Sequence, residues 1–192
     1  MMNEGRRDQK TAACCVFAGV SLDGCIARAD GSIDWLDAMN ARVPPGEDLG
    51  FAEFMNGVDA IVMGRVTFET VMRFPEWPYG AKPIVVLSHT LSRLPDAAPQ
   101  SVSLSHESPR TLIERLSAQD MRRIYVDGGV TVRSFLADSL ISEMTITTLP
   151  ILIGEGRRLF GSLPDDALLA HISTRVVHGF VQSTWKFVTT QA

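Results

Sequence analysis

The stretch Asp59 to Met72, DAIVMGRVTFETVM, reads as a buried strand, a tight turn and the beginning of a helix. The apolar run from Ala60 to Met63 is uninterrupted, as expected for a strand covered on both faces, and Gly64 ends it where the chain must turn. Thr67 stands where a helix N-cap would lie, and the apolar residues that follow it share one helical face. We therefore predict a strand-turn-helix unit around Gly64.

The turn at Gly64 has the chemistry of an anion site. The beginning of a helix presents unpaired backbone N–H groups and the positive end of the helix dipole, and Arg65 adds a positive charge beside them. A phosphate would suit this turn. A capped helix with an exposed arginine explains the same residues equally well.

Length and composition indicate one globular domain. The chain has 192 residues, of which 45% are apolar, and we expect a single domain over residues 12–192 behind a disordered tail over residues 1–11. A net charge of −4 and a pI near 5.5 argue against nucleic acid as a partner. The apolar runs are too short to span a membrane.

The N-terminus and the cysteines indicate a cytoplasmic protein. Arg6 and Arg7 precede an apolar run, as in a secretory signal, but acidic residues interrupt the positive region and no convincing cleavage site follows. Cys14, Cys15 and Cys25 lack the spacing of metal ligands, and we expect them to be core residues. We expect no metal site.

Strands and helices alternate between residues 48 and 140, which predicts a mostly parallel sheet. A first strand is expected over residues 12–20, and Ser108 with Pro109 marks the beginning of a helix. Beyond residue 141 strands follow one another without helices, so we expect antiparallel edge strands there. Residues 21–36, anchored by Trp35, and residues 154–158 are expected to be loops. The predicted fold class is α/β: a three-layer, mostly parallel sheet flanked by helices, with antiparallel C-terminal edge strands.

Ligands of open parallel sheets bind at the carboxyl ends of the strands. Besides Gly64, such ends are predicted at Ser88-His89, at Gly128-Gly129 with Thr131 as a second N-cap, and after Val20. Two glycine turns that lead into helices suit a molecule with two separated phosphates, although paired glycines also form tight turns for steric reasons alone. The patterns G-x-S-x-G, G-K-[ST] and G-x-G-x-x-G are absent.

Taken in order, Val62-Met63-Gly64-Arg65-x-Thr67, Leu87-Ser88 and Val126-Asp127-Gly128-Gly129 resemble the motifs of the dihydrofolate-reductase-like fold. The loop Ser21-Leu22-Asp23-Gly24 and the segment from Pro150 to Phe160 are more similar to its riboflavin-biosynthesis reductase branch and to bacterial relatives of that branch. The resemblance covers residues 12–189.

The resemblance implies an NADPH-dependent reductase that acts on a small heterocyclic or carbonyl substrate. It places Arg65, Ser88 and His89 at the 2′-phosphate of the cofactor. The other cofactor-binding residues that it implies are Ala18, Gly19, Ile26, Gly64, Thr67, Gly128, Gly129, Val130, Thr131 and Thr147.

The position of the proton donor is less well defined by the resemblance. Folate enzymes carry a carboxylate where this sequence has Asp48, which has an alternative role as a helix first-turn residue that complements the dipole. Asp23, Trp35 and Asp127 are candidate substrate-binding residues, while Trp35 also suits a loop anchor. The resemblance also implies a homodimer. The alternatives to a reductase are a nucleotide-binding or regulatory module without turnover and a flavin-binding protein.

Overall fold

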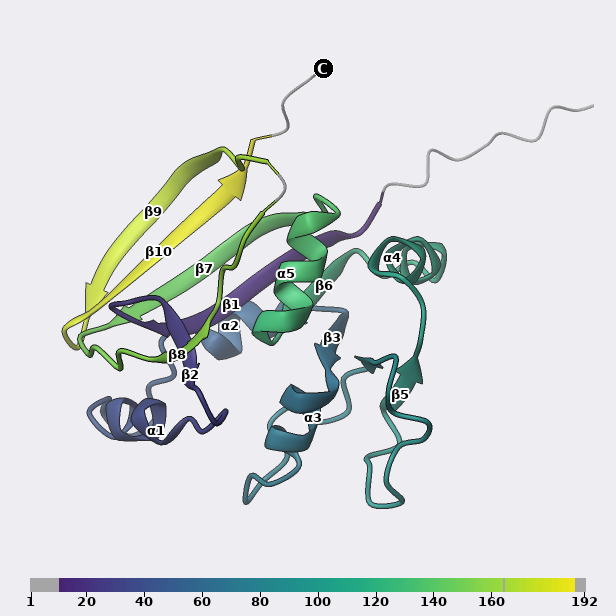
Figure 1. Cartoon of the computed structure of the whole chain (residues 1–192), viewed down its shortest axis with the longest axis horizontal. Coiled ribbons are helices and arrows are strands. Elements are labelled where there is room, and N and C mark those ends of the chain that lie inside the picture. Colours follow the sequence, from purple (N-terminus) through teal and green to yellow (C-terminus); the bar gives the residue numbers. More distant parts are fainter. Residues whose placement is uncertain (1–10, 164, 189–192) are drawn as a thin grey trace, which may run out of the picture.

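A computed structural model describes residues 11–163 and 165–188, so most of the predicted N-terminal tail lies outside it. Eight strands form one sheet in the order β5-β4-β3-β6-β1-β7-β10-β9, and β2 pairs with β8 in a second, small sheet (Figure 1). The strands are β1 (Ala13–Ser21), β2 (Cys25–Arg28), β3 (Ala60–Gly64), β4 (Ile84–Leu87), β5 (Val102–Ser105), β6 (Arg123–Asp127), β7 (Ile141–Leu149), β8 (Gly156–Arg158), β9 (Leu169–Val177) and β10 (Phe180–Phe187). The helices are α1 (Asp34–Asn40), α2 (Phe51–Asn56), α3 (Arg65–Val71), α4 (Pro109–Ala118) and α5 (Gly129–Ala137).

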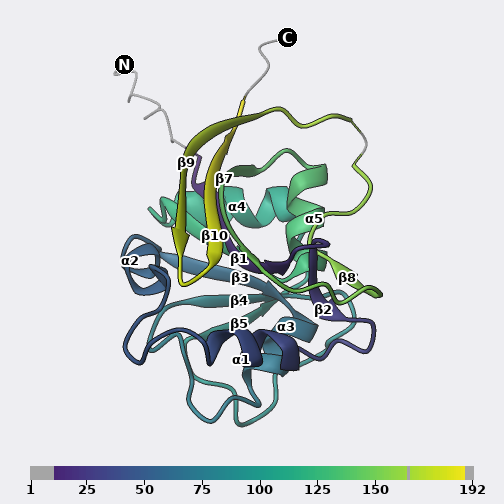
Figure 2. The ribbon, with the colours of Figure 1, turned by 90° about the vertical axis from the view of Figure 1, so that its left-hand side faces the viewer.

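The predicted fold class is confirmed. Strands β5, β4, β3, β6, β1 and β7 are joined by parallel pairings, whereas β10 runs antiparallel to both β7 and β9. The sheet is strongly twisted, so that β9 and β10 stand steeply against β3 and β4 (Figure 2).

Helices cover both faces of the sheet because its central strands are apolar on both sides. On β3, Ala60 and Val62 belong to a core cluster with residues of α4 and α5, while Ile61 and Met63 belong to a second cluster with residues of α2 and α3. Successive side chains of a strand point to opposite faces, and an uninterrupted apolar run therefore supplies two cores at once.

Two segments that were expected to be loops contain regular structure. Strand β2 pairs with β8, with Cys25 opposite Arg158 and Arg28 opposite Gly156, and α1 follows β2. The loop predictions for residues 21–36 and 154–158 were therefore wrong in these parts. The reason is physical: each short strand depends on a partner that lies about 130 residues away in the chain, and its own sequence has no clear two-residue period.

The helices at the two glycine turns begin earlier than predicted. Gly64 is the N-cap of α3 and Gly128 the N-cap of α5, so Thr67 and Thr131 lie inside the first turns and do not cap. Glycine itself takes the non-helical conformation at each boundary, and no side-chain cap is formed.

The predicted beginning of α4 is confirmed. Ser108 is its N-cap, the Ser108 hydroxyl oxygen accepts a hydrogen bond from the Thr111 N–H at 3.3 Å, and Pro109 follows as the first helical residue. We expect Ser108→Ala to lower the free energy of unfolding by about 1 kcal/mol and the melting temperature by about 2–4 °C. Thermal unfolding followed by circular dichroism measures the change. The exposed Ser162, replaced by Ala, is the control and should leave the melting temperature unchanged.

All three cysteines are buried free thiols. Burial raises the pKa of Cys14 to about 12 and that of Cys15 to about 11, so both are protonated at neutral pH. Within residues 11–163 and 165–188, no helix has the length and apolarity that crossing a membrane requires.

Candidate functional site at the carboxyl edge of the sheet

Strand register brings the two glycine turns to one edge of the sheet. Met63 is paired with Asp127, so β3 and β6 end side by side, and Gly64 is paired with Leu87 at the end of β4. The beginnings of α3 and α5 accordingly lie at the same edge (Figure 1).

The two turns are in direct contact. A Cβ atom on Gly64 would lie 2.8 Å from the Thr131 hydroxyl oxygen, and a Cβ atom on Gly128 would overlap the Thr67 hydroxyl. Gly128 also has a φ of +86°, which side-chain-bearing residues rarely adopt. Each glycine thus makes room for the threonine of the opposite helix, and the two turns pack directly against each other.

Strand β2 covers the first residues of α5. The Ile26 side chain would lie 2.7 Å from a Cβ atom on Gly129, whereas the Val130 side chain is 72% exposed. Beside this turn, Arg133 donates a hydrogen bond to the Arg158 carbonyl oxygen at 2.7 Å, and Arg158 donates to the Asp23 carbonyl oxygen at 2.9 Å. These two arginines were not predicted, because only the β2–β8 pairing brings residue 158 to α5.

Arg65 forms an ion pair within α3. Its Nη1 atom donates to both carboxylate oxygens of Glu69 at 2.8 Å. Glu69 was not predicted as a site residue, although a spacing of four residues between Glu69 and Arg65 is the signal for such an ion pair.

Ser88 and His89 follow β4, beside the turn at Gly64. The buried Ser88 hydroxyl oxygen accepts a hydrogen bond from the Leu91 N–H at 3.1 Å, and His89 is exposed. His106, after β5, was also missed: its Nδ1 lies 2.5 Å from the Ser88 carbonyl oxygen, which fixes Nδ1 as the protonated nitrogen.

Gly19 and Thr147 face the same side of the sheet as neighbours on β1 and β7. Thr147 is buried, and its hydroxyl oxygen accepts a hydrogen bond from Gln182 at 2.8 Å. Ala18 points to the opposite face and packs against the core that contains α5 residues. The predicted cofactor-binding residues of β1 and β7 are thus divided between the two faces.

Asp127 is the carboxylate that the structure places at this edge. Tyr125 pairs with Cys15, so Asp127 lies on the same sheet face as Gly19 by the two-residue period of both strands. The Tyr79 hydroxyl donates to Asp127 Oδ2 at 3.2 Å, and the Gly128 N–H donates to Oδ1 at 2.8 Å.

Asp127 is half-buried at the end of β6. Burial raises its pKa, against the lowering effect of its hydrogen bonds, and burial likewise raises the pKa of Tyr79. Asp127 therefore holds its proton to a higher pH than an ordinary aspartate does, which is a property of general acids.

Asp48 does not lie in a pocket. Its exposed carboxylate accepts hydrogen bonds from the Gly50 N–H at 2.9 Å and the Ala52 N–H at 2.7 Å, at the beginning of α2. The hydrogen bond from Ala52 is the main cause of its lowered pKa. These hydrogen bonds give Asp48 the helix-end role that was the alternative to a catalytic carboxylate.

The structure also gives Trp35 and Asp23 other roles than substrate contact. Trp35 is only 1% exposed and packs with Leu149 and Phe180, so neither face of its ring is open to a substrate. Asp23 accepts hydrogen bonds from the Ser21 hydroxyl at 2.5 Å and the Gly154 N–H at 2.8 Å, and Ser21 is the main cause of its lowered pKa. Asp23 thereby fastens the loop after β1 to the loop before β8.

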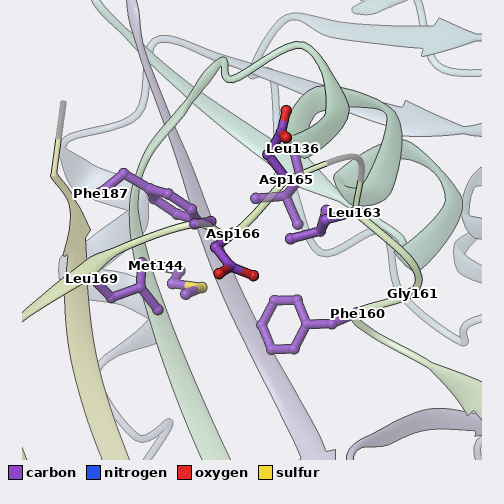
Figure 3. A pocket seen from close by; sticks show the side chains of 10 residues that line it. Leu136, Met144, Phe160, Gly161, Leu163, Asp165, Asp166, Leu169 and Phe187 are labelled. Carbon is purple, nitrogen blue, oxygen red and sulfur yellow. The ribbon is translucent and has the colours of Figure 1, made fainter. Parts of the chain in front are cut away.

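A pocket of about 380 Å³ lies elsewhere, against the C-terminal half of α5, and Asp166 stands among its apolar side chains (Figure 3). It is lined by Leu136, Met144, Phe160, Gly161, Leu163, Asp165, Asp166, Ala167, Leu169 and Phe187. None of the predicted site residues belongs to it. The described residues contain no group of three acidic, histidine or cysteine side chains that could hold a metal ion.

Two comparisons of sequence place this chain among known proteins. The family model of the RibD C-terminal domain matches residues 13–181. YwjB, an uncharacterised protein of Bacillus subtilis (strain 168), is 34% identical over 156 residues, which cover 80% of this chain and 86% of YwjB.

Solved structures agree with this assignment. A candidate riboflavin biosynthesis protein from Shewanella sp. PV-4 superimposes with a TM-score of 0.86 at 39% identity, covering 92% of this chain and 99% of that one. A Thermotoga maritima diaminohydroxyphosphoribosylaminopyrimidine deaminase/5-amino-6-(5-phosphoribosylamino)uracil reductase shares the fold, with a TM-score of 0.68 at 13% identity over 94% of this chain and 58% of that one. This chain therefore belongs to the RibD C-terminal domain family and has its dihydrofolate-reductase-like fold.

Proposed function

We propose that this protein is an NADPH-dependent reductase that transfers a hydride to a small heterocyclic or carbonyl substrate resembling a pterin, a pyrimidine or a riboflavin precursor. The observation that carries the proposal is the contact between the glycine turns at Gly64 and Gly128, beside Arg65. The reductase named for the Thermotoga relative supports the same reaction class.

The residues at this edge fit a dinucleotide phosphate. The backbone N–H groups at the beginning of α5, from Gly129 to Thr131, would suit the pyrophosphate because the beginning of a helix attracts anions. Arg65, Ser88 and His89 would hold the 2′-phosphate, since guanidinium and hydroxyl groups donate hydrogen bonds to phosphate oxygens. NADPH supplies the hydride when bound, and Gly19, Thr147 and Ile26 would border the reacting ring.

The proton that accompanies hydride transfer needs a donor in the protein. We assign this role to Asp127, which replaces Asp48. Its carboxyl group lies on the same sheet face as Gly19, is oriented by Tyr79 and Gly128, and has a pKa that burial raises. Protonation of the substrate nitrogen or oxygen by Asp127 would complete the reduction.

One experiment tests the proposed function against its alternatives. NADPH oxidation is followed by absorbance with pterins, pyrimidines, riboflavin precursors and quinones, and thermal unfolding is recorded with NADPH alone. A reductase oxidises NADPH with at least one of these substrates. Heat protection by NADPH without oxidation indicates a binding or regulatory module, and a yellow preparation indicates a flavin protein; either result contradicts the proposal.

We further propose a homodimer formed through the late edge strands in a cytoplasmic protein, with no nucleic-acid or membrane partner. Strand β9 is an exposed edge strand, and apolar side chains stand on it and on β10, namely Leu169, Ile172, Val176 and Val181. Light scattering after size-exclusion chromatography should give twice the chain mass of 21.0 kDa. Ile172→Lys should shift the protein toward the monomer, and a wild-type monomer at all concentrations would contradict the prediction.

A further inference from the structure

We propose that Glu69 competes with the cofactor's 2′-phosphate for Arg65 and thereby lowers the preference of this protein for NADPH over NADH. The inference rests on the proposed function. It names a specificity-determining residue that does not itself take part in the chemical step.

The starting observation is the geometry of the pair. Arg65 Nη1 lies 2.8 Å from both Glu69 carboxylate oxygens, and the two side chains are 41% and 42% exposed. The positive charge that would attract a phosphate is therefore already neutralised by a partner within the same helix. The pair is also open to an incoming ligand.

The Arg65 guanidinium has donors left for a second partner. Among the described residues, the hydrogen bonds of Arg65 all come from Nη1, while a guanidinium has five N–H donors in a planar fork. A phosphate bound to the remaining donors of the same guanidinium would place its negative charge near the Glu69 carboxylate or would displace it. In both cases binding of the phosphate is weakened, by repulsion or by loss of the ion pair.

The ribose of NADH lacks the 2′-phosphate and interacts with the Glu69 carboxylate in a different way. Its 2′-hydroxyl is a hydrogen-bond donor, and an ionised carboxylate is an acceptor; acidic residues recognise the ribose of NADH in this way in other dinucleotide sites. Glu69 therefore disfavours the phosphorylated cofactor and tolerates or favours the unphosphorylated one.

The test uses Glu69→Gln and needs no substrate. NADPH and NADH are titrated by nicotinamide fluorescence, and adenosine 2′,5′-bisphosphate and adenosine 5′-monophosphate by calorimetry. We expect Glu69→Gln to bind NADPH and the bisphosphate about threefold to tenfold more tightly. Binding of NADH and the monophosphate should be unchanged or weaker. Glu114→Gln removes an exposed carboxylate of α4 and is the charge-matched control, for which all four affinities should stay unchanged.

Unchanged or weaker NADPH binding by Glu69→Gln would overturn the inference. Arg65→Ala separates this failure from failure of the proposed function. If Arg65→Ala weakens NADPH and Glu69→Gln has no effect, only the competition is rejected. If Arg65→Ala also leaves NADPH binding unchanged, the phosphate site is rejected with it. Thermal unfolding without ligand shows that both variants are folded, since an exposed pair within one helix contributes little to stability.

Discussion

Asp127→Asn is expected to lower the turnover number by about 10²- to 10⁴-fold, the usual effect of a general acid. The substitution keeps the shape of the side chain and removes its ability to release a proton. NADPH affinity should remain near that of the wild type, because asparagine keeps a side-chain oxygen that can accept the hydrogen bond from the Gly128 N–H. The measurements are steady-state kinetics with the substrate identified by the oxidation panel and a fluorescence titration with NADPH.

The same substitution should not destabilise the fold. A carboxyl group whose pKa is raised by burial stabilises the folded state below its ordinary pKa, and this stabilisation is lost as the pH rises through the raised value. Asparagine does not ionise, so Asp127→Asn should melt at an equal or higher temperature than the wild type at neutral pH.

Two further variants make the Asp127 prediction specific. Asp37→Asn, on the exposed side of α1, is the matched control and should leave turnover unchanged. Tyr79→Phe removes only the hydroxyl group that orients Asp127 and should reduce turnover less than Asp127→Asn does. Full turnover in folded Asp127→Asn would contradict the assignment of the proton donor.

Arg65→Ala is expected to weaken NADPH binding by about 10- to 100-fold, which corresponds to the loss of hydrogen bonds to a charged group. NADH binding should change by less than about threefold, because only NADPH carries the 2′-phosphate. Fluorescence titrations of both cofactors measure the difference. The NADPH affinity of Arg65→Lys should fall between those of the wild type and Arg65→Ala, since an ammonium group keeps the charge but loses the planar fork.

Salt gives an independent check on Arg65. Added salt should weaken NADPH binding more in the wild type than in Arg65→Ala, because the contact that salt screens is absent from the variant. An equal loss of NADPH and NADH affinity in Arg65→Ala would show that Arg65 supports the turn and does not recognise the 2′-phosphate.

Much of the fold could be predicted from the sequence because its signals are local. The apolar run from Ala60 to Met63 specifies a strand buried on both faces, and the glycines at 64 and 128 specify where strands turn into helices. Alternation of such units implies a parallel sheet, and the carboxyl ends of parallel strands must share an edge. The location of the candidate site follows from these facts.

The chemistry of the site depends on contacts between distant residues, and here the sequence analysis was wrong or incomplete. Asp48 has the spacing of a catalytic carboxylate, but it binds the N–H groups at the beginning of α2, which is the local alternative that the sequence also offered. Trp35 is enclosed by residues of β7 and β10, and Tyr79 reaches Asp127 across 48 residues of chain. No local pattern in the sequence encodes the contacts of Trp35 and Tyr79.

By itself, the sequence determined the alternating strands and helices between residues 48 and 140, the two glycine turns and the family resemblance, because periodicity and backbone conformation depend on near neighbours. Only the tertiary structure decided that the turns interlock through Thr67 and Thr131, and that Asp127 is a half-buried carboxylate bonded to Tyr79. Burial and strand register are properties of the folded chain as a whole. They set which carboxyl group keeps its proton and which remains a solvated helix-end charge.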